Sequence, residues 1–229
     1  MEKSKSITPV AYIYNGFSEK FGIPRQSGRV EETVSEIVFE KEFRASDAIR
    51  GITDFSHLWL LFGFSEAKYD GSLTVRPPRL GGNTRVGVFA SRSPFRPNGL
   101  GLSRVKLLRV ENREGLGGVL IVGGADILSG SPVYDIKPYL PFADSVPDAS
   151  AGYSSSGVSH RLAVSDPYNM LGILPKETRE IVTGCISDDP RPSYQNDKDR
   201  VYAMVYGGYE IKFTVFDEKA VIRSVGPKQ

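Results

Sequence analysis

The sequence has few of the residues that metal and thiol chemistry require. Its 229 residues include one cysteine, Cys185, and two histidines, His57 and His160. A single cysteine cannot form an intramolecular disulfide, and this set of soft ligands is too small for a structural zinc site. Only two imidazoles are available as catalytic bases. The cysteine content predicts a protein of the reducing cytoplasm.

The sequence also lacks the patterns of membrane proteins and of common nucleotide folds. It has no apolar run long enough to span a membrane and no signal-peptide pattern. It has no phosphate-binding Walker loop and no nucleophile elbow. The GLGG stretch at residues 115–118 joins two expected strands and opens no helix. It therefore predicts a hairpin turn and not a Rossmann-type cofactor loop.

Acidic residues are absent from residues 71–110, although the whole chain is nearly balanced at a net charge of +2. Eight basic residues lie in this basic tract: Arg76, Arg79, Arg85, Arg92, Arg96, Arg104, Lys106 and Arg109. A guanidinium group with no acid beside it is best matched by phosphate or carboxylate, so the tract indicates an anionic partner. The alternative is that the acids of residues 31–47 fold back and pair with it.

The stretch RVGVFASRSPFRPNGLGLS, residues 85–103, places arginines and phenylalanines among glycines. A guanidinium group can meet a phosphate while an aromatic ring stacks on a base, so this combination suits a nucleic acid. The alternative places Phe89 and Phe95 in the hydrophobic core. For Phe89, which lies between Val88 and Ala90, a core position is favoured.

Hydrophobic periodicity predicts a mainly β protein with an α+β C-terminal part. Strands are expected at residues 9–17, 33–39, 55–64, 103–110, 119–122 and 132–136, and a short helix capped by Ser46 at residues 46–52. A helix beginning near Pro175 should precede strands at 201–205, 209–216 and 220–225. We expect domains at residues 1–148 and 167–229, joined by a Ser-, Ala- and Gly-rich linker at 149–166.

Two acids stand out near the expected strands. Asp126 ends a strand before a Ser-Gly-Ser-Pro turn. Asp135 and Lys137 are two residues apart, so they share one face of a strand. Their spacing favours a solvated ion pair at a sheet edge.

Two long stretches resemble a known family. TVRPPRLGGNTRVGVFASRSPFRPNGLGLS at 74–103 and DILSGSPVYDIKPYLPFADSVPDA at 126–149 are similar to the TsaA/TrmO family, also called YaeB or UPF0066, and DDPRPSY at 188–194 resembles its C-terminal domain. The resemblance implies an S-adenosylmethionine-dependent tRNA methyltransferase acting on N6 of threonylcarbamoyladenosine, beside the anticodon. It also implies an N-terminal β-barrel that binds the cofactor, and a homodimer with the cofactor near the subunit interface.

The resemblance also assigns cofactor contacts. They fall on Pro24, Arg25, Gln26, Ser65, Glu66, Arg92, Leu102, Asp126, Ile127, Leu128 and Ser129. Arg92 would pair with the methionine carboxylate, and Asp126 would bind a ribose hydroxyl or the amino group. Backbone groups at Leu102 and Leu128 would read the adenine edge. The chain departs from the usual family pattern at Ser65-Glu66, at Gly99 and at Ser129.

The remaining arginines are candidates for the substrate. Arg76, Arg79, Arg85 and Arg96 would contact RNA phosphate or the threonine carboxylate. No residue is an obvious general base; His57 and Asp135 are the candidates, and His57 lies in an apolar run typical of a core histidine. Two alternatives stay open: a methyltransferase of the same family with another RNA or small substrate, and a non-catalytic RNA-binding module. Neither DNA nor a membrane is expected as a partner.

Overall fold

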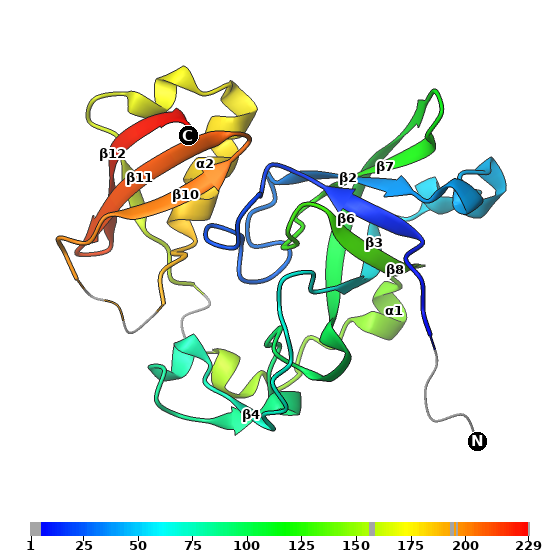
Figure 1. Ribbon diagram of the computed structural model, residues 1–229, viewed down its shortest axis with the longest axis horizontal. Coiled ribbons are helices and arrows are strands. Elements are labelled where there is room, and N and C mark those ends of the chain that lie inside the picture. The colour runs from blue at the N-terminus through cyan, green and yellow to red at the C-terminus, as the bar shows by residue number, and fades with distance from the viewer. Residues whose placement is uncertain (1–5, 156–158, 193–194, 196, 229) are drawn as a thin grey trace.

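Alternating apolar residues build a closed ring of six antiparallel strands in the computed structural model, which describes residues 6–155, 159–192, 195 and 197–228 (Figure 1). The order around the ring is β1-β2-β7-β6-β3-β8. Their bounds are β1 (Ala11–Tyr14), β2 (Val34–Phe39), β3 (His57–Gly63), β6 (Leu100–Arg113), β7 (Gly117–Gly123) and β8 (Ser131–Pro138). The expected strands of the N-terminal part are confirmed, and β6 is longer than predicted.

Strand β3 shows how the apolar run at residues 55–64 is used. Leu58, Leu60 and Phe62 are buried and belong to the core inside the ring, whereas the residues between them are only partly covered. Side chains alternate across a strand, so one face of β3 fills the ring while the other forms its outer surface. The predicted strand is confirmed, but only one of its two faces is buried.

The β2–β3 connection is a series of short 3₁₀ turns, and a tight hairpin joins β6 to β7. The predicted helix at residues 46–52 is wrong: the chain forms η2 (Ser46–Ile49) and η3 (Ile52–Asp54), after η1 (Lys41–Phe43). Gly51 between them has φ 80°, which ends the first turn, and Ser46 makes no cap. The predicted β6–β7 hairpin is confirmed; at Gly117 a Cβ would lie 2.6 Å from the Arg44 carbonyl oxygen.

Residues 64–99 leave the ring between β3 and β6. They form a two-stranded ribbon of β4 (Thr74–Val75) and β5 (Val86–Gly87), which lies apart from the ring in Figure 1. Three 3₁₀ turns complete the segment: η4 (Pro78–Leu80), η5 (Val88–Ala90) and η6 (Pro97–Gly99). The segment rejoins the ring where Phe64 N–H donates to the Gly99 carbonyl at 2.9 Å. We call residues 64–99 the excursion.

The C-terminal part is a four-stranded sheet of order β10-β11-β12-β9 with one long helix. After α1 (Pro141–Asp144) and η7 (Gly152–Ser155), its elements are β9 (Ala163–Ser165), η8 (Met170–Ile173), α2 (Lys176–Ser187), β10 (Tyr202–Tyr206), β11 (Tyr209–Phe216) and β12 (Lys219–Pro227). The predicted helix after Pro175 and the three strands are confirmed. Strand β9, in the stretch expected as a linker, pairs in parallel with β12. No helix in the described part of the chain is long and apolar enough to span a membrane.

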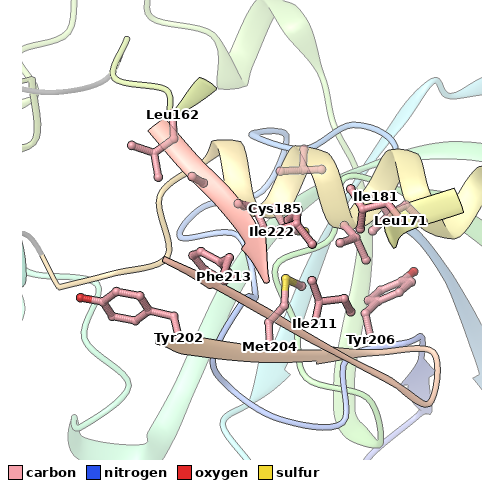
Figure 2. Close-up of a cluster of buried hydrophobic side chains, with 14 of the residues drawn as sticks. Leu162, Leu171, Ile181, Cys185, Tyr202, Met204, Tyr206, Ile211, Phe213 and Ile222 are labelled. Atoms are coloured by element: carbon pink, nitrogen blue, oxygen red, sulfur yellow. The ribbon is translucent and has the colours of Figure 1, made fainter. Parts of the chain in front are cut away.

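The β1–β2 connection joins the core of the C-terminal sheet. Figure 2 shows the labelled side chains of that core between α2 and strands β10–β12. Phe17 and Val30, 0% and 2% exposed, belong to the same cluster, and Phe21 and Ile23 pack against it. Phe17 meets Tyr206 edge to face with ring centroids 4.8 Å apart. The two sheets are therefore tied together by a segment of the first.

Candidate functional site

The basic tract remains largely without acids in the folded protein. Of its residues whose side chains the structure describes, only Arg109 forms an ion pair, with Glu111 at 2.6 Å. Glu36, within the acidic residues 31–47, pairs with Arg113, which lies beyond the tract. In the described part of the chain, the alternative in which those acids neutralise the tract is therefore wrong.

The favoured core position of Phe89 is also wrong. Phe89 is 77% exposed and Phe95 is 51% exposed. The 3₁₀ turn η5 directs Val88, 1% exposed, inward, and the next side chain then points to solvent. Two exposed phenylalanines in one loop, close to arginines, are an arrangement that single-stranded nucleic acids bind by stacking.

A cleft of about 1370 Å³ opens between the excursion, the loop at residues 25–29 and the C-terminal part. Basic and aromatic residues of the excursion line it, among them Arg76, Arg85, Arg92, Phe89 and Phe95. Arg25, Gln26 and Arg29 form another part of the wall, and Ala151, Tyr153, Ser154, Pro190 and Pro192 close it. The cleft is thus basic, aromatic and formed by segments far apart in the sequence.

Three predicted cofactor residues from separate segments meet beside this cleft. The Arg92 guanidinium donates to Gln26 Oε1 at 2.5 Å. The Ser103 hydroxyl donates to the Asp126 carboxylate, and the Ser27 backbone N–H is close enough to lower the pKa of that carboxyl. Arg92 is near enough for its charge to act on that carboxylate. We call Gln26, Arg92, Ser103 and Asp126 the Asp126 cluster.

Burial raises the pKa of Asp126 above its ordinary value, and the bonds from Ser103 and Ser27 and the charge of Arg92 only partly offset this effect. A partly enclosed carboxylate gains from a ligand that brings hydroxyl donors or a positive charge. The chemistry of the Asp126 cluster therefore fits a ribose or an ammonium group at Asp126 and a carboxylate at Arg92.

The other residues of the 126–129 turn are used mainly to hold the turn in place. The Ile127 side chain is 1% exposed in the ring core, and its carbonyl accepts from Asn15 Nδ2 at 2.9 Å. The Ser129 hydroxyl accepts from the Asn15 backbone N–H at 3.1 Å, and the Leu128 carbonyl accepts from Ser131 N–H at 3.2 Å. Asn15, which the sequence did not single out, thus fixes the turn that carries Asp126.

The remaining predicted cofactor residues lie on three other segments of the chain. Pro24 is buried in the loop that carries Arg25, and the Arg25 guanidinium donates to the Arg191 carbonyl. Leu102, 58% exposed, precedes Ser103 on β6. Ser65 and Glu66 are exposed just after β3; the Ser65 hydroxyl lies 3.4 Å from that of Ser131, and Glu66 pairs with Lys20. These residues do not line the cleft, Arg25 excepted.

The arginines predicted to contact the substrate do not all line the cleft. Arg76 and Arg85 line it, and Arg85 Nε donates to the Thr74 hydroxyl at 2.7 Å. Arg96 does not line it; its guanidinium donates to the Ser91 carbonyl at 2.9 Å and so holds the loop that carries Arg92. The side chain of Arg79 lies outside the described part of the structure.

Neither candidate base lines the cleft. His57 is not a core histidine: it is partly exposed on the outer face of β3, with Nδ1 2.9 Å from the Ser56 hydroxyl. Burial, then Arg104 and Lys106, lower the pKa of His57. Asp135 forms the predicted ion pair with Lys137 at 2.9 Å, but β8 pairs on both sides and is not a sheet edge. Among the described residues, no cluster of acids, histidines and cysteine is suited to a metal ion.

Sequence reasoning missed the C-terminal contribution to the cleft. Pro190 and Pro192 belong to the quoted DDPRPSY stretch, and Tyr153 and Ser154 to the expected linker. The compositions of both stretches predict turns, but a turn-forming sequence does not indicate which surface of the protein the turn will contact. The one signal in the sequence was the DDPRPSY stretch, which resembles the family's C-terminal domain.

Comparisons with known proteins agree with this geometry. Residues 12–145 match the tRNA-methyltransferase O N-terminal domain model, and residues 170–228 match the TrmO C-terminal domain model. A tRNA (adenine(37)-N6)-methyltransferase of Escherichia coli (strain K12) is 39% identical over 96% of this chain and 97% of its own. A putative S-adenosylmethionine-dependent methyltransferase, RcsF, of Pseudomonas aeruginosa is 40% identical over 83% of each chain. The crystal structure of TrmO from P. aeruginosa has a TM-score of 0.81 and 29% identity, covering 100% of this chain and 99% of that one.

These matches define the class of protein: the chain contains the N-terminal and the C-terminal domain of a tRNA methyltransferase, in that order. The chain belongs to the TrmO family, and the resemblance predicted from its sequence is confirmed.

Proposed function

We propose that this protein is a methyltransferase that uses S-adenosylmethionine to methylate N6 of adenosine 37 in tRNA. The cleft is the observation that carries the proposal, because exposed arginines and phenylalanines line it and its wall includes Gln26 and Arg92 of the Asp126 cluster. A site for RNA thus adjoins a site whose donors and acceptors fit the cofactor. Membership of the TrmO family and the names of the relatives support the same activity.

The residues of the Asp126 cluster fit S-adenosylmethionine group by group. Arg92 would bind the methionine carboxylate, and Asp126 would accept from a ribose hydroxyl or the amino group. The cofactor, when bound, supplies a methyl group carried on a positively charged sulfur. Gln26 orients Arg92 through the bond at 2.5 Å, and Ser103 orients Asp126. Pro24, Arg25, Ser65, Glu66, Leu102 and residues 127–129 remain proposed contacts around it.

The protein's contribution to the reaction is mainly alignment. Holding the attacking nitrogen in line with the methyl group can supply a large part of the rate enhancement without a dedicated base. The cleft provides such a hold: rings of Phe89 and Phe95 for unstacked bases, and cations at Arg76 and Arg85 for phosphate.

We further propose that the methylated base is threonylcarbamoyladenosine, beside the anticodon. Its threonine carboxylate would be an anion close to the reacting nitrogen. The excursion arginines that line the cleft, Arg76, Arg85 and Arg92, form no ion pair within the described part of the chain and would bind it. An unmodified adenosine brings no such group. The modification would therefore act as a recognition element.

The assembly proposed with this function is a homodimer of two-domain chains in the cytoplasm, with domains at 1–148 and 167–229 and the closed ring as the cofactor-binding β-barrel. Exposed Leu102 and Leu108 on the outer face of β6, 58% and 41% accessible, support a partner copy next to the cofactor. Light scattering on the purified protein measures the oligomeric state directly.

One experiment tests the function. The protein is incubated with S-adenosylmethionine and either of two tRNA pools, with or without threonylcarbamoyladenosine, and the nucleosides are analysed by mass spectrometry. We expect a methyl group on N6 only in the modified pool. Methylation of unmodified adenosine would refute the threonylcarbamoyl substrate, and cofactor binding without methylation of either pool would favour another substrate. A pure RNA-binding module would show no thermal stabilisation by S-adenosylmethionine.

A further inference from the structure

The loop that carries Pro24, Arg25 and Gln26 belongs covalently to the ring but packs on the C-terminal sheet. On one side, Phe21 stacks on Tyr202 and Phe213, with ring centroids 6.1 and 6.4 Å apart. Gly22, at φ 97°, lies so close to Met204 that a Cβ would approach its terminal carbon to 2.9 Å. These contacts place Phe21 and Gly22, where the chain enters the loop, against the C-terminal sheet.

An ionic group holds the other end of the loop. Arg29 Nε lies 2.5 Å from Asp188 Oδ1, and Arg161 Nη1 lies 2.9 Å from the same oxygen. The second Arg161 nitrogen donates to the Arg29 carbonyl at 2.6 Å. The Asp188 side chain is 3% exposed and that of Arg29 is 14% exposed, so water screens this contact little.

The position of Asp188 needs these arginines. Asp188 is the C-cap of α2, where a carboxylate faces the negative end of the helix dipole. Burial there is unfavourable for a charge without partners. One of these partners, Arg29, comes from the cofactor loop. The loop therefore stabilises the end of α2, and the end of α2 in turn holds the loop in place.

The ring side holds this loop at Ser27 and Gly28. Gly28 N–H donates to the Gly124 carbonyl at 2.8 Å, and the Ser27 hydroxyl accepts from Arg104 N–H at 3.2 Å. Both follow Gln26 in the chain. Before Gln26, Phe21 and Gly22 contact the C-terminal sheet, and the Arg25 guanidinium donates to the Arg191 carbonyl.

We propose that Asp188 and Arg161 are positioning residues for the cofactor loop, which set the affinity for S-adenosylmethionine without touching it. This inference rests on the proposed function, since it assumes that the loop binds the cofactor. Neutralising Asp188 would remove the ion pair that holds Arg29 and would loosen the loop. Gln26, and through it Arg92, would then lose its fixed position, and the cofactor would have to order the loop on binding.

The test compares Asp188→Asn and Arg161→Gln with wild type in the full-length protein. We expect the Kd for S-adenosylmethionine, measured by calorimetry, to rise about tenfold in Asp188→Asn and severalfold in Arg161→Gln, the size typical of coupling between sites. The KM for the cofactor should rise with it, while kcat at saturating cofactor and the affinity for tRNA stay near wild type. Lys212→Gln, which removes the exposed Lys212–Glu210 pair at 2.9 Å on β11, is the matched control and should change none of these values.

The outcomes separate this inference from the function itself. If wild type does not bind S-adenosylmethionine, the proposed function fails. If wild type binds and both variants bind equally well, with only their melting temperatures lowered, the residues are structural and the positioning role is refuted. Should Asp188→Asn fail to fold, Arg161→Gln decides, because that side chain is 41% exposed and its loss leaves Arg29 paired with Asp188.

Discussion

The fold divides the basic tract at residue 100 into two regions with opposite environments. Residues 71–99 lie in the excursion, with exposed rings and arginines around a cleft. Residues 100–110 lie in β6, where Ser103 and Val105 face the ring core and the cations face outward. There Arg104 covers the ring of Tyr139 at 5.6 Å and Arg109 pairs with Glu111. Positive charge thus lies around an open cleft in one region and on the outside of a strand in the other.

Backbone chemistry, more than charge, separates the two regions. The excursion contains glycines in the left-handed region, such as Gly81 and Gly99 at φ 73° and 58°, and Asn98 at φ 66°. Such residues interrupt strand pairing and leave side chains without a sheet to cover them. Gly99 has a positive φ of 58°, whereas the ring of proline fixes a negative φ. The excursion of this chain therefore ends in a conformation that proline could not adopt.

The largest expected effect is on the affinity for S-adenosylmethionine, and it should differ between substitutions of Arg92 and of Arg104. Arg92→Met removes the bond to Gln26 and the charge near Asp126, so the affinity for S-adenosylmethionine should fall roughly 10- to 100-fold, the range of a hydrogen bond to a charged group. Arg104→Met, on the strand, should leave this affinity near wild type. Calorimetric titration measures both. Equal losses would show that the two regions of the tract do not differ.

Among exposed aromatic rings, those of the excursion should contribute to the affinity for tRNA and those elsewhere should not. Phe89→Ala should weaken tRNA binding about tenfold, since stacking of one base on an aromatic ring is worth about 1–3 kcal/mol. The side chain is 77% exposed, so the melting temperature should hardly change. Phe142→Ala removes an equally accessible ring, 87% exposed, from α1 and is the control. Filter binding at fixed salt decides; an unchanged affinity in Phe89→Ala would remove this ring from the RNA site.

Two glycines close together should differ in their effect on stability. A Cβ at Gly101 would lie 2.4 Å from the Phe62 ring, so Gly101→Ala should overpack β6 and cost about 1–3 kcal/mol of unfolding free energy. Gly99 has nothing within 4 Å of that position, but its φ of 58° strains an alanine by about 1 kcal/mol. Urea denaturation measures both. A larger loss in Gly99→Ala would contradict the view that β6 is packed and the excursion is open.

Single cations of the excursion should give smaller effects. Arg76→Gln should weaken tRNA binding severalfold and reduce the slope of log K against log salt by about 1, while cofactor affinity stays constant. Lys106→Gln, from the outer face of β6, should leave the slope unchanged. Arg96 is a poorer test, because its bond to the Ser91 carbonyl also positions Arg92.

The smallest effect is a dependence of stability on pH. The folded state raises the pKa of Asp126 above its ordinary 3.8, so folded protein binds this proton more tightly than unfolded protein. Ionisation of Asp126 therefore costs stability as pH rises through the raised pKa. Asp126→Asn removes that cost, and its melting temperature relative to wild type should increase from pH 3.8 towards neutrality. A constant difference across this range would show that the pKa is not raised.

Much of the fold follows from local patterns. The alternation in β3, the glycine hairpin before Gly117 and the helix after Pro175 are each encoded within a few residues. The helix at residues 46–52 was wrongly predicted because Gly51 breaks it, and Phe89 was placed in the core because its apolar neighbours do not reveal a 3₁₀ turn. Periodicity reports which side of an element is buried, and it fails where the element is a single turn.

The site depends on contacts that no local pattern contains. Gln26, Arg92 and Asp126 are far apart in the sequence and were grouped through the family resemblance, and the structure brings them together. Asn15, Arg29 and Asp188 were not anticipated, because each acts through a partner more than 100 residues away along the chain. Such pairings arise from tertiary packing and have no signature within a single sequence.

Photo-crosslinking of bound tRNA to the protein, followed by mass spectrometry of the crosslinked peptides, tests most directly whether the excursion is the RNA surface. Crosslinks at residues 85–96, including Phe89 and Phe95, with peptides of β6 uncrosslinked, are the predicted result. Crosslinks concentrated on the outer face of β6, around Arg104 and Lys106, would contradict the assignment of RNA binding to the cleft.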